Sequence, residues 1–165
     1  MIMGFTNLII EQTPKTPSVD LNKFTGDLIF CGRSTPEDAS LIYVPVLNWV
    51  EQYIHAPRPV TNVRLNLDYF NTTSALWLSK LLRRLANTQD PDHVLILHLY
   101  LPADEYDSLR DFNDIRDAFI PISDILHEEI HNLGIKLYGK NEKGEIIREK
   151  LIVIEANLYV NAELS

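Results

Sequence analysis

Two short strand-like segments lie near the start of the chain. Residues 18–21 and 28–31 flank a turn around Gly26, and Gly32 follows the second segment. Glycine and aspartate at the turn, between segments of this length, are typical of a β-hairpin. The pattern therefore predicts a hairpin that ends at Gly32.

The next segment has the apolar spacing of a helix. Thr35 is a suitable N-cap, Pro36 would occupy the first helical position, and two acidic residues follow. We therefore expect the helix to begin there. Pro45 lies inside the segment and predicts a kink. The apolar residues recur every three or four positions and predict one buried face: Ala39, Ile42, Tyr43, Val46, Leu47, Val50 and Ile54.

A strand and a helix are predicted to meet in the middle of the chain. Four apolar residues alternate with polar ones and predict a strand with one buried face: Val63, Leu65, Leu67 and Tyr69. In the segment that follows, leucines gather on one helical side: Leu78, Leu81, Leu82 and Leu85. The polar sequence 70–74 separates the two elements.

The second half of the chain continues the alternation. Residues 94–100 are apolar on both faces and predict a central strand, in which we expect His98 to be a hydrogen-bonded core residue. Residues 103–119 have the pattern of one amphipathic helix, and a second helix is expected over 122–133. Strand-like residues around a turn at 141–144 then predict a closing hairpin.

These elements predict a single α/β domain over residues 1–165, with a mixed sheet, packed helices and a C-terminal hairpin extension. The formal net charge is -8, which repels nucleic acid. The chain shows no signal-peptide pattern, and its apolar runs fall short of the roughly 18 residues of a membrane span. We therefore expect a cytoplasmic protein that binds neither nucleic acid nor membranes.

The polar sequence between the predicted strand and helix is the first candidate site. Asn71, Thr72, Thr73 and Ser74 place side-chain oxygens beside the unpaired backbone N–H groups of a helix start. Helix capping explains this pattern by itself. Capping is compatible with phosphorylation, however, because a hydroxyl at a helix start lies on the surface.

Four sequence blocks carry a resemblance to a known family. They are residues 18–21, 26–39, 43–53 and 67–74, and they follow the order and spacing of the SiaC-type family of bacterial regulatory phosphoproteins. The resemblance covers about residues 14–100, whereas 101–165 is a divergent C-terminal part. The family more often has other residues at Thr35, Asp38 and Thr73.

The resemblance implies a STAS-like fold and a non-catalytic signalling function without a cofactor or metal. Thr72 would be phosphorylated by a protein kinase and dephosphorylated by a PP2C-type phosphatase. The unphosphorylated form would bind a target such as a diguanylate cyclase, so that the output is cyclic di-GMP signalling. The expected partner-binding residues surround the phosphorylation site: Tyr69, Phe70, Asn71, Thr73 and Ser74.

A second motif leads to an alternative hypothesis. His127, Glu128 and His131 form an H-E-x-x-H sequence on a predicted helix, which is typical of zinc peptidases. Leu137 occupies the position of the third histidine in one zinc-peptidase subgroup, and the replacement candidates, Glu149 and Glu155, lie in or beside a predicted strand. A small zinc hydrolase is therefore the alternative, and a STAS-like interaction domain that is never phosphorylated is a third.

Overall fold

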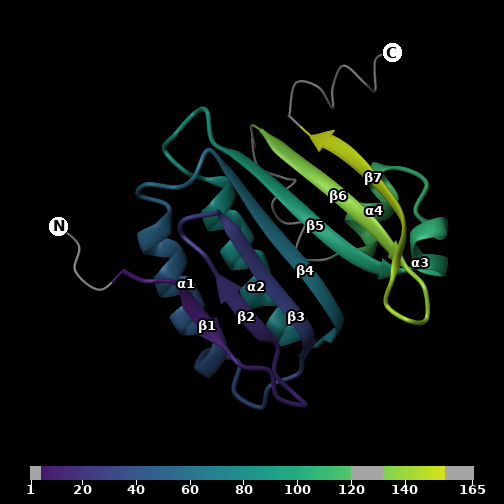
Figure 1. The fold of residues 1–165 in the computed structure, drawn as a ribbon, viewed down its shortest axis with the longest axis horizontal. Helices are drawn as coiled ribbons and strands as arrows, with labels where there is room; N and C mark the ends of the chain where they lie inside the picture. The colour runs from purple at the N-terminus through teal and green to yellow at the C-terminus, as the bar shows by residue number, and fades with distance from the viewer. Residues whose placement is uncertain (1–4, 120–131, 155–165) are drawn as a thin grey trace.

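The computed structural model describes residues 5–119 and 132–154, which contain a seven-stranded mixed sheet with helices packed on it (Figure 1). The strands lie side by side in chain order: β1 (Leu8–Ile10), β2 (Ser18–Leu21), β3 (Asp27–Ser34), β4 (Val60–Phe70), β5 (Val94–Pro102), β6 (Leu133–Lys140) and β7 (Ile146–Ile154). Strands β3 to β6 are parallel, and the outer pairs are antiparallel. The predicted α/β class, mixed sheet and C-terminal hairpin are confirmed.

Two long helices cover one face of the sheet. Helix α1 (Ser40–Tyr53) connects β3 to β4, and α2 (Thr72–Ala86) connects β4 to β5. Both lie behind the sheet in Figure 1. The shorter α3 (Ala103–Ser108) and α4 (Phe112–Ala118) follow β5. None of the helices in the described ranges has the length and apolar character needed to cross a membrane.

The core lies between the sheet and these two helices. Alternate residues of the strands point toward the helices, and the predicted leucine face of α2 is buried against them. Each fully buried side chain of this size contributes roughly 1.5–3 kcal/mol to folding. The core includes Leu28, Phe30, Val63, Leu65, Leu97, Leu99, Tyr43, Val46, Val50, Leu78 and Leu82.

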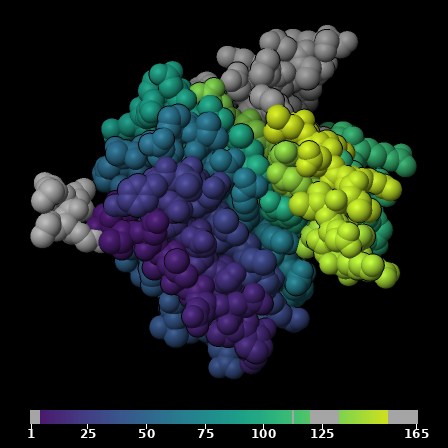
Figure 2. Space-filling model, in the orientation of Figure 1, coloured from purple at the N-terminus to yellow at the C-terminus, as the bar shows by residue number. Residues whose placement is uncertain are grey.

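The other face of the central strands holds a polar and aromatic cluster. His98 is only 5% exposed, and its ring nitrogens lie 2.7 Å from the Asn62 side-chain oxygen and 2.8 Å from the Tyr138 hydroxyl. Tyr138 stacks on Tyr100, which accepts a hydrogen bond from Arg64. His98 is therefore the hydrogen-bonded interior residue that the sequence predicted, although side chains of the sheet itself surround it. Figure 2 shows this face, with β7 along one edge and β1 toward the other.

Helix α1 begins later than predicted. Its first residue is Ser40, and Thr35 lies outside it. Thr35 is instead tied to neighbouring segments, because its N–H donates to the Lys15 carbonyl and its hydroxyl accepts from Arg33. Asp38 accepts the Ser40 N–H and hydroxyl, which leads the chain into the helix. The helix runs through Pro45.

A β-bulge changes the predicted pattern in β3 and β4. Gly32 does not end β3, which continues to Ser34. Gly32 pairs with Leu67, but Arg33 pairs with Tyr69, so Asp68 is an extra residue in β4. A bulge reverses which face the following residues occupy. Tyr69 was expected to be buried, and it is 54% exposed for this reason.

The segment 103–119 is not one helix. Leu109 has an extended backbone between α3 and α4, and Asp111 begins α4 with a capping box that includes Asp114. This local stop and start signal outweighs the continuous apolar spacing. Leu133, the expected end of the following helix, is instead the first residue of β6, and residues 120–131 lie outside the described ranges.

Candidate functional site

The start of α2 is built by Asn71. Its backbone is extended, and its side-chain oxygen accepts the Ser74 N–H at 2.9 Å. Its own N–H donates to the Ser34 carbonyl at 3.0 Å, and its carbonyl accepts from Ala75. Capping by the polar residues 71–74 was predicted, and Asn71 is the residue that caps; it also joins the helix start to the end of β3.

A network of buried hydroxyl groups lies beneath this helix start. Ser34, Tyr43 and Ser74 are each 0% exposed. The Ser34 hydroxyl lies 2.6 Å from the Tyr43 hydroxyl and donates to the Ser74 hydroxyl at 2.8 Å, and Ser74 donates to the Ser34 carbonyl. Burial raises the pKa of Tyr43, so its hydroxyl remains protonated. The network joins β3, α1 and α2 at one point.

This burial changes the assignment of Ser74. The sequence placed Ser74 among the partner-binding residues, but its side chain lies inside the protein and hydrogen-bonds to Ser34. Ser74 therefore presents no hydroxyl to another protein in this structure. Its packing beneath the helix start follows from helix geometry, because Ser74 shares the buried side of α2 with Leu78.

Four exposed residues lie in the first turns of α2 or shortly before it along the chain, and we call them the α2-start patch: Tyr69, Thr72, Thr73 and Leu76. Both threonines are exposed, and Leu76 is 61% exposed. Arg33 lies over the Tyr69 ring, with 5.2 Å between its guanidinium carbon and the ring centre. Phe70 is half-buried and contacts Phe119 at 5.7 Å between ring centres. Thr72 therefore has the accessibility that phosphorylation requires.

The electrostatic setting of Thr72 suits a negative group. The first turn of α2 contains no acidic residue, and its backbone N–H groups point toward the start of the helix. A helix N-terminus stabilises a nearby anion by about 0.3–1 kcal/mol. A phosphate on Thr72 is therefore compatible with the folded chain.

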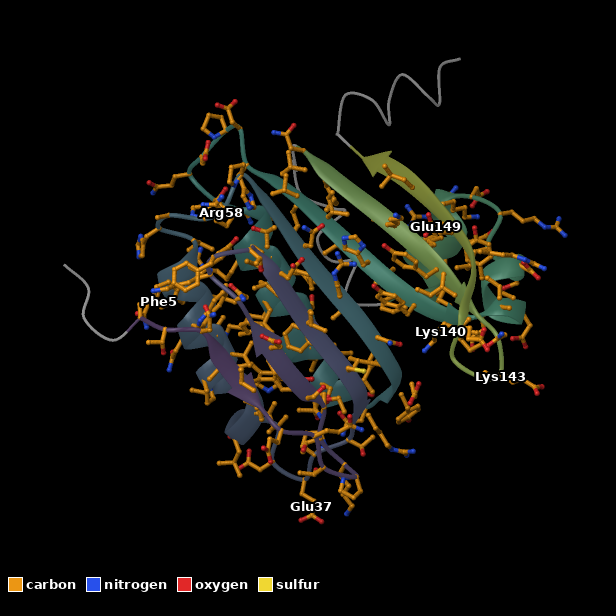
Figure 3. The ribbon with its side chains drawn as sticks, in the orientation of Figure 1. Phe5, Glu37, Arg58, Lys140, Lys143 and Glu149 are labelled. Carbon is orange, nitrogen blue, oxygen red and sulfur yellow. The ribbon has the colours of Figure 1, made fainter. Side chains whose placement is uncertain are left out.

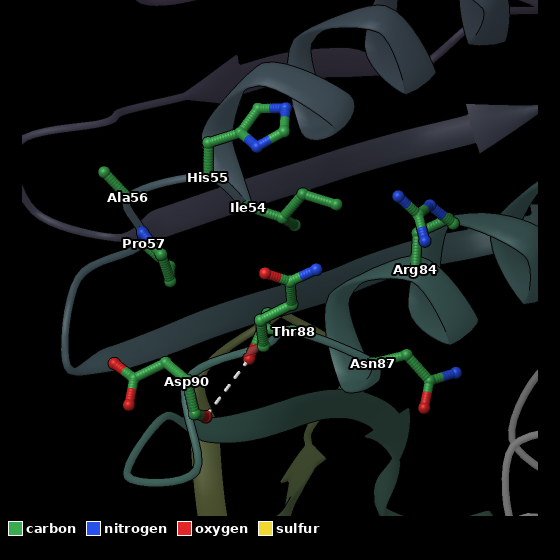
Figure 4. A pocket seen from close by; sticks show the side chains of 9 residues that line it. Ile54, His55, Ala56, Pro57, Arg84, Asn87, Thr88 and Asp90 are labelled. Carbon is green, nitrogen blue, oxygen red and sulfur yellow. Dashed lines mark hydrogen bonds between the residues drawn. The ribbon is translucent and has the colours of Figure 1, made fainter.

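A second hydroxyl network lies at the other end of the parallel strands, where β4 and β5 begin. The Tyr53 and Thr61 hydroxyls lie 2.8 Å apart, and the Thr61 hydroxyl lies 2.7 Å from the ring Nε2 atom of His93. Burial lowers the pKa of His93, although Asp90 partly opposes this effect. The neighbouring surface contains a cavity of about 300 Å³ between the ends of α1 and α2 (Figure 4). Because this cavity lies at the far end of α2, it is separate from the α2-start patch.

The residues of the zinc hypothesis are largely outside the described ranges. His127, Glu128 and His131 belong to the segment 120–131, and Glu155 follows the last described residue. Leu137 is buried in β6, and Glu149 in β7 lies 3.7 Å from the Lys136 ammonium. Residues 5–119 and 132–154 contain no group of three side chains that could hold a metal ion. The hypothesis therefore stays untested.

Comparison with protein families identifies the chain. A family model described as SiaC family regulatory phosphoprotein matches residues 10–126. The chain belongs to this family. The match extends past residue 100, where the sequence resemblance was expected to fade. A comparison with curated proteins found no significant match.

Solved structures of SiaC from Pseudomonas aeruginosa have a similar fold. The apo form has a TM-score of 0.56 at 22% identity, over 70% of this chain and 90% of that chain. SiaC in complex with the diguanylate cyclase SiaD, which it activates, has a TM-score of 0.59 at 21% identity, over 79% and 99% of the two chains. The fold is thus that of the SiaC structures.

Sequence reasoning found the exposed part of the site but missed its support. Ser34 and Tyr43 are far from Ser74 along the chain, and a strand end or a helix face gives no sign that the three hydroxyls meet. The only local signal is that Ser34 is a polar residue at the end of an apolar strand. Its partners become visible only when β3 and β4 are paired in register.

Proposed function

We propose that this regulatory protein is switched by reversible phosphorylation of Thr72. A protein kinase adds the phosphate and a PP2C-type phosphatase removes it. The unphosphorylated form binds a downstream target such as a diguanylate cyclase, and phosphorylation releases that target. The exchange takes place in the cytoplasm. The observation that carries the proposal is the exposed residue Thr72 at a firmly held helix start in a SiaC-family chain.

The support beneath Thr72 favours a switch that changes the surface and preserves the fold. Asn71 caps the helix, and the Ser34–Ser74–Tyr43 network fixes the same turn from below. A phosphothreonine adds about 1.5–2 negative charges at neutral pH. Because the helix dipole favours that charge, the folded state tolerates it. The effect of phosphorylation then falls on whatever contacts the α2-start patch.

The patch has the composition of a docking surface. Tyr69 and Leu76 expose apolar area on either side of Thr72 along the chain, and Phe70, Asn71 and Thr73 complete the proposed contact region. Burying a phosphate dianion in such an interface without a cationic partner costs several kcal/mol. Since about 1.4 kcal/mol corresponds to tenfold in affinity, phosphorylation would reduce binding by at least about tenfold.

The identity of the target comes by analogy. SiaC from Pseudomonas aeruginosa is solved as the activator of the diguanylate cyclase SiaD, and this chain shares its fold. We extend that pairing to this chain as part of the proposal. Ser74 has a supporting function within it, because its hydroxyl is buried.

Mass measurement of protein purified from its native cells tests the modification. We expect a fraction of the protein to carry one phosphate, which peptide mapping assigns to Thr72. A chromosomal Thr72→Ala variant should lack that form. The neighbouring Thr73→Ala variant is the matched control and should retain it, because Thr73 is also exposed but is not the proposed site. A phosphate on Thr73 alone, or no phosphate with the cognate kinase overproduced, would contradict the proposal.

A further inference from the structure

Strands β4 and β5 separate before they end. Their pairing stops at Leu65 and Leu99. Beyond that point β4 remains paired with β3 as far as Phe70, and β5 remains paired with β6 as far as Pro102. Figure 1 shows the two strands diverging toward their carboxyl ends. Crevices at the carboxyl ends of parallel strands are common binding sites.

A cavity of about 410 Å³ occupies this position, and we call it the β4–β5 cleft. Its walls come from the ends of both strands and from α3, α4 and β6: Leu67, Asp68, Tyr69, Phe70, Tyr100, Leu101, Pro102, Glu105, Ala118, Phe119 and Lys140. The walls are mainly apolar, with four aromatic rings. This volume accommodates one large side chain with a flanking group.

The charges around the cleft are mostly negative. Lys140 is labelled in Figure 3, at the end of β6. Its ammonium donates to the Asn66 side chain at 2.6 Å and lies 3.8 Å from Asp68, so its charge is already engaged. Glu105 is exposed and has no ion pair within the described ranges. An adjoining hollow of about 530 Å³ shares Asp68 and Lys140 and adds Asp104 and Glu142. The two hollows together hold four carboxylates and one ammonium.

We propose that the β4–β5 cleft binds a segment of a partner protein in which an aromatic side chain is flanked by lysine or arginine. The aromatic side chain fills the space between Phe70, Tyr100 and Phe119, and the cationic group pairs with Glu105 at the rim. Aromatic walls also attract cations through their ring faces. The cleft shares Tyr69 with the α2-start patch, so a partner can cover both surfaces.

This inference concerns the unmodified chain and does not depend on phosphorylation of Thr72. Its failure can therefore be distinguished from failure of the proposed switch. The probes are two end-blocked tripeptides, lysine–tryptophan–lysine and glutamate–tryptophan–glutamate, which share the same aromatic centre. Titration of each into ¹⁵N-labelled full-length protein, followed by NMR, locates the binding site. A third titration uses free tryptamine.

We expect the lysine peptide to cause saturable shifts at residues that line the cleft, and the glutamate peptide to bind at least about tenfold more weakly because like charges repel. Glu105→Gln should lower the affinity for the lysine peptide by about threefold or more, since it removes the unpaired carboxylate. Asp92→Asn, an exposed residue just before β5 that lines neither hollow, is the matched control and should change affinity by less than about twofold. Ala118→Trp should abolish binding by filling the space.

Several outcomes would overturn the proposal. Shifts confined to other surfaces, or equal binding of the two tripeptides, would show that the cleft does not select this chemistry. Unchanged binding in a folded Ala118→Trp variant would place the peptide elsewhere. Tryptamine that binds as tightly as the lysine peptide would indicate a site for a free amine and not for a protein segment.

Discussion

Helix α1 is fixed near both ends by a buried tyrosine, yet the two ends have different surroundings. At the start of the helix the Tyr43 hydroxyl lies 2.6 Å from Ser34, and at the end the Tyr53 hydroxyl lies 2.8 Å from Thr61. In both places the hydroxyl of a serine or threonine on a strand links the tyrosine to a third residue. That residue is Ser74 at the carboxyl edge of the sheet and His93 at the amino edge.

The two networks differ in chemistry because their third residues differ. Ser74 lies in the same helical turn as the exposed Thr72, and burial keeps the Tyr43 hydroxyl of this network protonated near neutral pH. His93 has a titratable ring, so the amino edge responds to protons. The same arrangement of hydroxyl groups therefore lies beneath the proposed phosphorylation site at one edge and includes a titratable ring at the other.

Lowering the pH should change the free energy of unfolding more than any substitution below, and it should leave the Ser34–Ser74–Tyr43 network unchanged. Burial, with the nearby charges of Arg64 and Lys136, lowers the pKa of His98 to about 4, and burial also lowers that of His93. The unfolded chain takes up these protons below about pH 6.5, but the folded chain resists, so stability falls as pH drops from about 6.5 to about 4. For His98 the loss is about 3 kcal/mol. Urea unfolding across this range will measure it.

A His98→Gln variant provides the comparison, because the same carboxylates titrate in both proteins. Its stability should change less with pH than that of the unmodified chain, although it is less stable near pH 7. Amide shifts at Ser74 and Ala75 should remain constant while those around His93 and His98 move. Equal pH slopes for the two proteins would contradict the assignment of this acid sensitivity to His98.

Removing the central hydroxyl of each network separates the two edges directly. Ser34→Ala leaves the Tyr43 hydroxyl without its nearest partner, and Thr61→Val leaves the Nε2 atom of His93 without its partner. A buried polar group left unpaired costs about 1–3 kcal/mol, so both variants should lose that much unfolding free energy. Only Ser34→Ala should speed hydrogen exchange at Ser74 and Ala75. Faster exchange there in Thr61→Val would show that the two networks are not independent.

The sequence predicted the parts of the site that depend on local chemistry. A cap within the polar residues 71–74 and the leucine face of α2 both follow from spacing within a few residues, and the structure confirms the cap, at Asn71, and the buried face. The capping pattern at Thr35 was equally convincing, but tertiary contacts with Lys15 and Arg33 engage that residue instead. A local signal is therefore reliable only where the surrounding packing agrees with it.

The features that the sequence could not provide depend on strand register. The bulge at Asp68 turns Tyr69 outward, and the separation of β4 from β5 opens the β4–β5 cleft. Neither is visible in the alternation of residues 63–69, which continues unbroken through the bulge. Ser74 was misassigned for a different reason, because it lies four residues before Leu78 and so belongs to the buried side that helical spacing defines.

The cap itself should have a smaller effect than the networks. Asn71→Ala removes the acceptor of the Ser74 N–H and should reduce the unfolding free energy by about 1 kcal/mol. Asn71→Ser should restore most of that loss, because serine also accepts from the first turn of a helix. Thr73→Ala, on the exposed side of the same turn, should stay within about 0.5 kcal/mol of the unmodified chain. An equal loss in Asn71→Ala and Thr73→Ala would contradict the capping geometry.

The most direct test of the switch compares one protein in two states. The purified chain, before and after phosphorylation by its kinase, is titrated into a diguanylate cyclase from the same organism. The account predicts that the unmodified chain binds, that phosphate on Thr72 weakens binding by at least about tenfold, and that Thr72→Ala binds regardless of the kinase. Equal affinity of the unmodified and Thr72-phosphorylated chains for the cyclase would contradict it.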